Sequence, residues 1–436
     1  MEQIVNDQLL ATGYLLAWIL VFAWYQFMRP VLDAGSAIIG TYILYAVFSI
    51  FSINDPVFSS SFEPLEFFPY LYLFLMLLIA LSPAIYNHLR PAKTIKEPHT
   101  RVLTCISVII IVCGLLQVPS ILSNFNEGLV KLFLDSDAGK DAYESHMEDI
   151  GDSGSAITNL PAVIFNSLFD ISVFLFFYIL TLKKRNIYLV IGMGFSIFIG
   201  MMLPVMSGLR GGVIISLLTV IAGYMFFRQY LSKKLNRVIQ GLCIFIVIIV
   251  SLPIIAISVS RFDGRSSSGV MGAINWYVGQ GSLYFNNYGL DAGGIRNGDR
   301  TANLFKRVID SDTPRNYDER RNKYYYLEMD DYYFTTFVGD FTIDYGPVAA
   351  VFIFIIFNGL VLTQIRPRDG TLRLDQMLLV FFTVCICMQG GMTLFSYSDT
   401  AGIRIVTQGG LYAYLRYHDA LLEKFPSHTE EQNPSS

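Results

Sequence analysis

Long apolar runs alternate with short polar segments along most of this chain. A helix that crosses a bilayer needs about 20 mainly apolar residues. Eleven stretches meet this requirement, at residues 8–28, 34–53, 67–87, 102–122, 161–182, 187–205, 212–228, 238–259, 345–365, 376–397 and 401–417. The pattern therefore predicts an all-α polytopic membrane protein with about 11 transmembrane helices.

Two long polar segments interrupt this pattern and suggest the domain organisation. Residues 1–259 hold eight of the predicted spans and include an acidic segment at 123–160. Residues 260–344 are polar but rich in tyrosine, so we expect a folded loop region rather than disorder. The last spans occupy 345–417, and a polar tail follows at 418–436.

The distribution of lysine and arginine predicts the orientation. Cytoplasmic loops of membrane proteins carry an excess of these residues. The basic residues of this chain fall in alternate short segments, namely Arg29; Arg90, Lys93, Lys96 and Arg101; Lys183, Lys184 and Arg185; Arg228, Lys233, Lys234 and Arg237; and Arg366, Arg368 and Arg373. If these segments are cytoplasmic, the N-terminus and both long polar segments lie outside and the C-terminal tail lies inside.

Composition excludes several classes of protein. Hydrophobic residues make up 53% of the chain and charged residues only 15%, against about 25% charged residues in soluble domains. The mean hydropathy is +0.48. A net charge of −4 without a basic tail argues against nucleic-acid binding. The five cysteines all fall in apolar runs, so neither disulfides nor a zinc site is expected.

The first candidate for chemistry is the sequence Met-Ser-Gly-Leu-Arg-Gly-Gly at 206–212, between two predicted spans. Arg210 lies close to hydrocarbon, where a charged side chain is costly and often functional. Glycines beside a helix N-terminus expose backbone N–H groups that suit a phosphate. The alternative is an arginine that reaches for lipid headgroups.

Further arginines are expected near the same face of the membrane. Arg261 and Arg265 follow the eighth predicted span, and Arg404 lies near the outer end of the last one. Guanidinium groups bind pyrophosphate through paired, charge-assisted hydrogen bonds. Together with Arg210, these residues form a predicted pyrophosphate site. Anchoring at the interface is the alternative for Arg261 and Arg265.

A third motif contains two acidic residues, Asp340 and Asp344, just before the ninth predicted span. Their spacing of four places both on one face of a helix. A carboxylate at an apolar boundary can have a raised pKa and act as a base, whereas the alternative is a helix cap. Asp170, in the fifth predicted span, could serve a proton relay or pair with an arginine.

Aromatic residues of the loop region could form a platform for sugars, since apolar ring faces pack against rings of other kinds. The candidates are Trp276, Tyr284, Tyr325 and Tyr332. Packing within the loop region is the alternative reading. No metal-binding motif stands out, and we expect neither a metal nor another cofactor.

Taken together, these features resemble the Wzy-type oligosaccharide repeat unit polymerases of bacterial O-antigen and capsule pathways. The resemblance rests on about eleven spans, the Ser-Gly-x-Arg-Gly turn at 207–211, a large late loop, and the run Phe-x-Gly-Asp-x-x-x-Asp-Tyr-Gly at 337–346. It implies a GT-C-like fold and an inverting, metal-independent glycosyl transfer. A glycan linked to undecaprenyl pyrophosphate would move onto a new lipid-linked repeat unit at the outer face of the bacterial inner membrane.

The resemblance also implies partners, and the chemistry of a pyrophosphate leaving group and a hydroxyl acceptor suggests roles for the residues named above. The partners would be the undecaprenyl-pyrophosphate-linked oligosaccharide, membrane lipids and a chain-length regulator protein. Arg210 would stabilise the leaving pyrophosphate with Arg261, Arg265 and Arg404, and Asp340 or Asp344 would activate the acceptor hydroxyl.

Two other functions fit the layout. O-antigen ligases are related to these polymerases, but in them a histidine of the large loop is implicated, and residues 260–344 contain no histidine. A flippase or another transporter would explain Asp170. Transporters usually show paired halves with matching interrupted helices, and no such symmetry is visible in this sequence.

Overall fold

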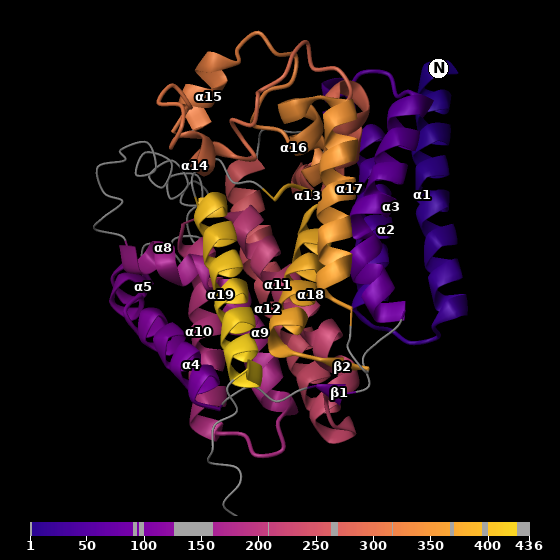
Figure 1. The fold of residues 1–436 in the computed structure, drawn as a ribbon. Helices are drawn as coiled ribbons and strands as arrows, with labels where there is room; N and C mark the ends of the chain where they lie inside the picture. Colours follow the sequence, from indigo (N-terminus) through magenta and orange to yellow (C-terminus); the bar gives the residue numbers. More distant parts are fainter. Residues whose placement is uncertain are drawn as a thin grey trace, which may run out of the picture.

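The computed structural model describes residues 2–89, 94–95, 100–125, 160–207, 209–262, 269–315, 317–366, 370–394 and 400–424. Helices dominate these residues, and the strands among them form one short parallel pair (Figure 1). Most of the predicted acidic segment 123–160, the residue Arg265 and the end of the tail lie outside the described residues.

The α-helices described in the N-terminal part are α1 (Glu2–Met28), α2 (Ala34–Ile53), α3 (Phe67–Leu89), α4 (Thr100–Leu115), α5 (Val118–Phe125), α8 (Leu160–Ser167), α9 (Phe169–Thr181), α10 (Ile187–Met206), α11 (Arg210–Phe227) and α12 (Lys233–Phe262). The later helices are α13 (Gly269–Tyr288), α14 (Asn303–Lys306), α15 (Tyr317–Lys323), α16 (Thr336–Tyr345), α17 (Pro347–Gln364), α18 (Leu374–Gln389) and α19 (Thr400–Lys424). The short 3₁₀ turns are η1 (Phe58–Ser61) and η4 (Arg228–Tyr230), and the strands are β1 (Thr94–Ile95) and β2 (Thr371–Leu372).

The all-helical, membrane-embedded character predicted from the sequence is confirmed. Seven helices are long and apolar enough to cross a membrane: Val5–Met28, Ala34–Ile53, Phe67–Leu89, Arg101–Ser123, Ile187–Met206, Gly211–Tyr230 and Pro347–Gln364. Two shorter apolar helices, α9 and α18, lie at further predicted spans. The two remaining predicted spans, 238–259 and 401–417, fall within α12 and α19. The count of 11 crossings and the GT-C-like fold stay predictions.

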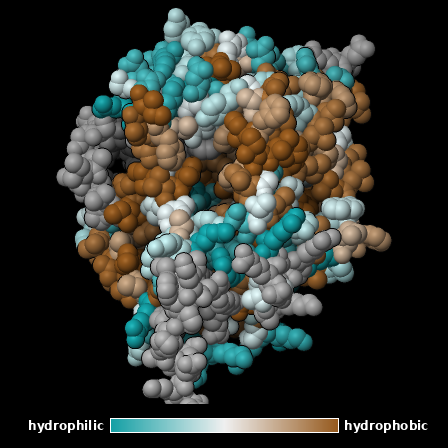
Figure 2. All heavy atoms as spheres, viewed as in Figure 1, coloured by the Kyte–Doolittle hydropathy of each residue, from teal (hydrophilic) through white to brown (hydrophobic). Residues whose placement is uncertain are grey.

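The surface has the distribution of polarity that a membrane protein needs. Hydrophobic side chains gather across the middle of the molecule, and hydrophilic ones gather above them, over α14 and α15 (Figure 2). Large apolar residues of α17, such as Phe352 and Ile356, point outward. In water such side chains would be withdrawn from the surface, whereas in a bilayer they contact lipid chains.

The two ends of the bundle differ in the segments they carry. The beginning of α1 lies at the same end as α14 and α15, and α19 runs from this end toward the opposite one (Figure 1). At the opposite end, β1 pairs with β2 in register Thr94 with Thr371 and Ile95 with Leu372. Two of the predicted basic loops therefore meet there. Which end faces the cytoplasm stays a prediction.

Several predicted spans are interrupted in the structure. The predicted span 161–182 breaks at Leu168 into α8 and α9, and the span 102–122 breaks between α4 and α5. The span predicted at 376–397 ends at Gln389, and the chain then folds back against α16. There the backbone N–H groups of Phe337 and Thr336 donate to the carbonyls of Gly390 (2.8 Å) and Met392 (3.0 Å).

The loop region predicted at 260–344 contains a helix of the bundle. Within it, α13 packs along α2 over much of its length, and a Cβ built on Gly279 would lie 2.4 Å from the carbonyl carbon of Phe48. Glycine permits this close approach of two helix backbones. The polar composition of α13 concealed it from the hydropathy pattern. Residues 289–335, with α14 and α15, remain above the bundle, and we call them the cap.

Local sequence explains where the helices beside the cap begin. Between α16 and α17, Gly346 adopts φ 83°, a conformation that glycine tolerates best, and Pro347 starts the next helix. Gly346 is the N-cap of α17 and no side chain caps it. The helix-cap alternative for Asp340 and Asp344 is therefore wrong, since both lie within α16.

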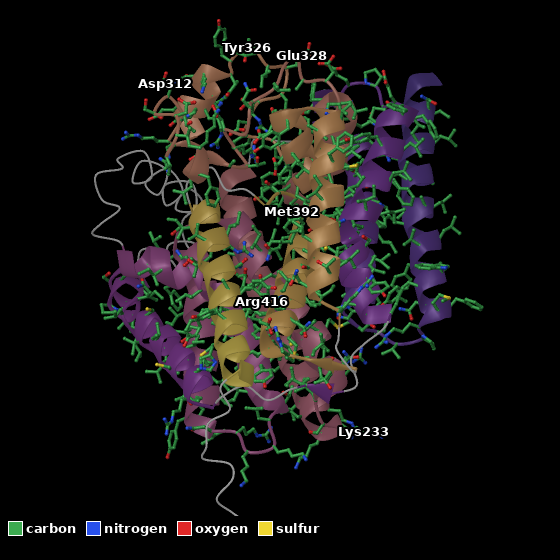
Figure 3. All side chains as sticks on the ribbon, viewed as in Figure 1. Lys233, Asp312, Tyr326, Glu328, Met392 and Arg416 are labelled. Atoms are coloured by element: carbon green, nitrogen blue, oxygen red, sulfur yellow. The ribbon has the colours of Figure 1, made fainter. Side chains whose placement is uncertain are left out.

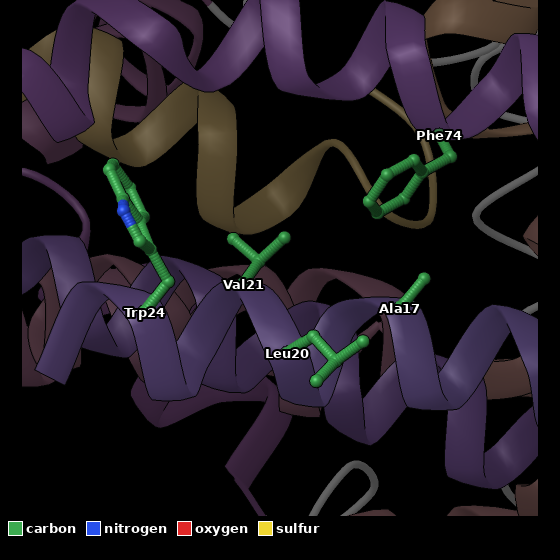
Figure 4. Close-up of a pocket in the computed structure, with 5 residues that line it drawn as sticks. All are labelled: Ala17, Leu20, Val21, Trp24 and Phe74. Atoms are coloured by element: carbon green, nitrogen blue, oxygen red, sulfur yellow. The ribbon is translucent and has the colours of Figure 1, made fainter. Parts of the chain in front are cut away.

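An apolar groove separates parts of α1 and α3 on the outside of the bundle (Figure 4). It has a volume of about 330 Å³ and is lined by Ala17, Leu20, Val21, Trp24 and Phe74. All five side chains lie within two of the helices that are long enough to span a membrane. Lipid chains fill such grooves, so the groove belongs to the lipid-facing surface.

The contact between α2 and α13 yields a stability prediction. Gly279→Ala places a methyl group against rigid backbone and is expected to lower the free energy of unfolding by about 1–3 kcal/mol. Gly359→Ala in α17 is the matched control, because no atom lies within 4 Å of its built Cβ. Thermal unfolding of the two purified variants in detergent measures the difference. Equal midpoints would show that the helices do not touch at Gly279.

Candidate functional site

One carboxylate of the cap, that of Asp331, pairs with three arginines of the same region. Asp331 forms ion pairs with Arg296, with Nη1 of Arg300 at 3.0 Å and with Nε of Arg320 at 2.6 Å. All four side chains are buried. Burial alone would raise the pKa of Asp331, but Arg300, Arg296 and Arg320 together hold the pKa well below its usual range. The carboxylate is therefore ionised at neutral pH.

Asp344, in α16, is the second anion of this network and is fully buried. Its Oδ1 lies 3.0 Å from Nε of Arg296. Its Oδ2 accepts hydrogen bonds from the backbone N–H and the hydroxyl of Thr301, both at 2.7 Å, and from the backbone N–H of Arg300 at 3.3 Å. The acceptor capacity of Asp344 is thus largely used.

Asp340, one turn earlier in α16, is also fully buried but has fewer partners. Its Oδ1 lies 3.1 Å from Nε of Arg300, a charge contact without an aligned hydrogen bond. Its Oδ2 accepts a hydrogen bond from the Thr393 hydroxyl at 3.0 Å. Burial raises the pKa of Asp340, and the pull of Arg300 and Arg296 in the opposite direction does not cancel it.

Six buried groups therefore balance in charge and join three parts of the chain. Arg296, Arg300, Arg320 and Asp331 come from the cap, Asp340 and Asp344 from α16, and Thr393 follows α18. We call the six charged residues the cap network. The four-residue spacing of Asp340 and Asp344 does place both carboxylates toward the cap, where Asp340 meets Arg300 and Asp344 meets Arg296. A balanced network leaves no surplus positive charge for a phosphate.

Arg210 and Arg261 are placed by their helices. Arg210 is the first residue of α11, and a Cβ built on the next residue, Gly211, would lie 2.3 Å from Oη of Tyr277 in α13. The start of α11 is therefore packed against a helix that leads into the cap. After the short turn η4, α12 runs back along α11 in the opposite direction. Arg261 is near the C-terminal end of α12, so it lies toward the end of the bundle at which α11 begins. The side chains of Arg210 and Arg261 lie outside the described part.

Arg404 lies inside the bundle and not in the predicted pyrophosphate site. The sequence predicts that Arg404 joins an arginine cluster, but in the structure it pairs with Asp170. Nε of Arg404 donates a hydrogen bond to Oδ2 of Asp170 at 2.7 Å. Gln408 donates to the same oxygen at 2.5 Å, and Gln389 accepts from Nη2 of Arg404 at 3.1 Å. The salt-bridge interpretation of Asp170 is therefore correct. These contacts join α9, α18 and α19 inside the bundle, and none of them involves a residue of the cap network.

The four predicted sugar-binding aromatics separate into two groups. Trp276 stacks on Phe58 with centroids 5.4 Å apart, and Tyr284 stacks on Tyr333 at 4.3 Å. Both are buried, so the packing interpretation describes them better in this structure. Tyr325 and Tyr332 belong to the cap, and Tyr325 is 84% exposed. Of the four, Tyr325 is the ring most available to a ligand.

Sequence reasoning missed Arg296, Arg300, Arg320 and Asp331, which carry most of the cap network. A faint signal exists in the spacing of Arg296 and Arg300, since residues four apart share a helix face. However, the two arginines follow a glycine-rich segment in which no helix is predicted. Their acidic partners lie between 31 and 48 positions away in the sequence, counting from Arg300 to Asp331 and from Arg296 to Asp344.

No protein-family model, no curated protein and no solved structure matches this chain. Among the described residues, no group of three His, Cys, Asp or Glu side chains is placed to hold a metal ion. The chemistry of the site is therefore argued from its own arginines, carboxylates and aromatic rings.

Removal of the central carboxylate tests the cap network. Asp331→Asn leaves buried guanidinium groups without their shared anion and is expected to destabilise the cap by about 3–5 kcal/mol. The neighbouring Asp330→Asn breaks an exposed pair with Arg321 and is expected to cost about 0–1 kcal/mol. Hydrogen exchange of residues 289–335 in the purified protein distinguishes the two variants. Similar exchange in both would contradict a central role for Asp331.

The pair inside the bundle has its own test. Arg404→Gln leaves the buried charge of Asp170 without its cation, so the yield of monodisperse protein in detergent is expected to fall sharply. The double variant Asp170→Asn/Arg404→Gln removes both charges and is expected to recover most of that yield. If the double variant were as poor as the single one, the ion pair would not be the reason for the loss.

Proposed function

We propose that this chain is a membrane-embedded glycosyltransferase of the Wzy type. It would transfer a glycan chain from undecaprenyl pyrophosphate onto a new lipid-linked repeat unit. The reaction would take place at the end of the bundle that carries the cap, on the outer face of a bacterial inner membrane. The N-terminus would then lie outside and the C-terminus inside.

The observation that carries this proposal is the arrangement of α11 and α12 beneath the cap. These helices form an antiparallel pair, so that Arg210 at the start of one and Arg261 at the end of the other belong to the same end of the bundle. Arg265 follows Arg261 closely in the sequence. A set of arginines at the mouth of an apolar bundle suits a lipid-linked diphosphate, whose anionic group stays at the interface.

The leaving group explains why these arginines would matter. When the glycosidic bond breaks, negative charge develops on the lipid pyrophosphate. Fixed guanidinium groups stabilise that charge without reorganisation, and they do so more strongly where water is excluded. The backbone N–H groups at the start of α11 add a partial positive charge, and Leu209, the N-cap, supplies no side-chain hydrogen bond to them.

The acceptor hydroxyl needs a base, and the contacts favour Asp340 over Asp344. Asp344 accepts hydrogen bonds from Thr301 and the backbone of Arg300 in addition to its pair with Arg296. Asp340 keeps one hydrogen bond and one charge contact, and burial raises its pKa. A raised pKa makes a carboxylate a better proton acceptor. Asp340 would exchange its contact with Arg300 for the substrate hydroxyl.

The transporter alternative loses its main support. Asp170 was the residue that favoured transport, and in this structure its carboxylate is paired with Arg404 and bonded to Gln408. A carboxylate held by such partners is typical of a helix contact. The ligase of the same superfamily differs from the polymerase only in its acceptor, and it remains the alternative to the proposal.

The function is tested in a purified system. Arg210→Ala is expected to lower chain extension of undecaprenyl-pyrophosphate-linked repeat units by about 10²–10³, the effect of removing one preorganised charge partner. Arg185→Ala, an exposed arginine between α9 and α10, is the control and should extend chains normally.

The assay needs no ion gradient, so extension by the wild type would exclude pure transport. Normal chain length in Arg210→Ala would remove this arginine from the mechanism. The absence of extension by folded wild-type protein would contradict the proposed function itself, and addition of a lipid A core acceptor would separate the ligase from the polymerase.

A further inference from the structure

The cap contains a cavity of about 590 Å³ on the outward side of the cap network. Its lining includes Arg296, Arg320, Arg321, Tyr325, Glu328 and Asp330. Tyr326 and Glu328, from the same segment, lie at the end of the molecule opposite Lys233 (Figure 3). The cavity therefore opens away from the bundle and is distinct from the start of α11, where the pyrophosphate is proposed to bind.

The chemistry of the lining favours sugars over phosphates. The charged residues that line the cavity are three arginines and four acids, namely Arg296, Arg320, Arg321, Asp318, Glu328, Asp330 and Asp331. Two of the arginines already share Asp331, and Arg321 is paired with Asp330. Such a lining offers both donors and acceptors without surplus positive charge, as a polyhydroxylated ligand requires.

An exposed ring completes this lining. Tyr325 is 84% exposed although it borders a cavity, and the ring of Tyr326 meets it edge to face at 5.9 Å. One face of the Tyr325 ring is thus available for the apolar face of a sugar. A tyrosine this exposed buries little apolar surface, so it contributes little to folding.

The base of the cavity contains a spare donor. Arg296 is only 3% exposed, and its Nη2 has no hydrogen-bond partner among the described residues. A buried donor without a partner is unfavourable. A hydroxyl group that reached the base of the cavity would supply the missing acceptor.

We propose that this cavity is a glycan-binding subsite that holds sugar residues of the growing chain. This inference rests on the proposed function, which supplies a glycan whose lipid end remains at the membrane. With the pyrophosphate beneath the cap, sugars remote from the lipid would reach the outward cavity. Tyr325 would stack on a sugar ring while Glu328 and Asp330 accept hydrogen bonds from its hydroxyl groups.

The experiment uses full-length protein in detergent and a lipid-free oligosaccharide of several repeat units, released by mild acid from the polysaccharide of the source bacterium. Saturation-transfer NMR and calorimetry measure its binding. Tyr325→Ala is expected to weaken binding about tenfold, whereas Tyr325→Phe, which keeps the ring, should bind within about twofold of the wild type. Inorganic pyrophosphate should not displace the oligosaccharide.

Tyr188→Ala is the matched control, because Tyr188 is 81% exposed and lies in the first turn of α10, outside the cap. Equal binding by Tyr325→Ala and Tyr188→Ala, or no binding by wild-type protein, would overturn the subsite. Chain extension measured on the same samples separates this failure from that of the proposed function. An active enzyme without glycan binding removes only the subsite, whereas binding that depends on Tyr325 without extension removes only the polymerase.

Discussion

A charge withdrawn from water must have a partner, and this requirement organises both polar regions of the protein. In the cap network, Asp331 pairs with three arginines, and Arg296 and Arg300 extend these pairs to Asp344 and Asp340 of α16. Inside the bundle, Arg404 and Asp170 follow the same rule. Burial of each charge is costly, and the cost is offset only while its partner stays in place. The pairs therefore fix how the cap, α16 and α19 sit relative to the other helices, beyond what apolar packing against lipid could specify.

The balance of charge also limits the chemistry. Arginines that are neutralised by buried carboxylates stabilise the fold, and they have little left with which to attract a diphosphate. The proposed leaving-group site consequently depends on Arg210, Arg261 and Arg265, which do not belong to the cap network. The two carboxylates of α16 differ for a similar reason. Asp344 is surrounded by donors, and only Asp340 combines a raised pKa with few partners. Asp340 and Asp344 thus share a helix face but differ in their ability to accept a proton from a substrate.

The sequence predicted the helical, membrane-embedded architecture because long apolar runs are a local property of the chain. It also predicted that Asp340 and Asp344 share a helix face, which depends only on helical periodicity. It could not reveal α13 as a bundle helix, since glycine and polar residues lower its hydropathy while one of these glycines, Gly279, lets it approach α2. The sequence could not identify Arg404 as the partner of Asp170, for a different reason. The two residues are 234 positions apart, and they meet because α19 packs against α8 and α18, and α18 packs against α9.

The cap network and the outward cavity share residues, and this has a consequence for substrate handling. Arg296 borders the cavity on one side and contacts Asp344 on the other, and Arg320 borders it while holding Asp331. A ligand in the cavity and the carboxylates of α16 therefore touch the same guanidinium groups. Because Arg300 links Asp331 to Asp340, a change at the base of the cavity alters the electrostatic field at the proposed base through only two ion pairs. Energetic coupling between two sites is carried by chains of packed side chains and ion pairs, and here the buried arginines and carboxylates of the cap network form such a chain.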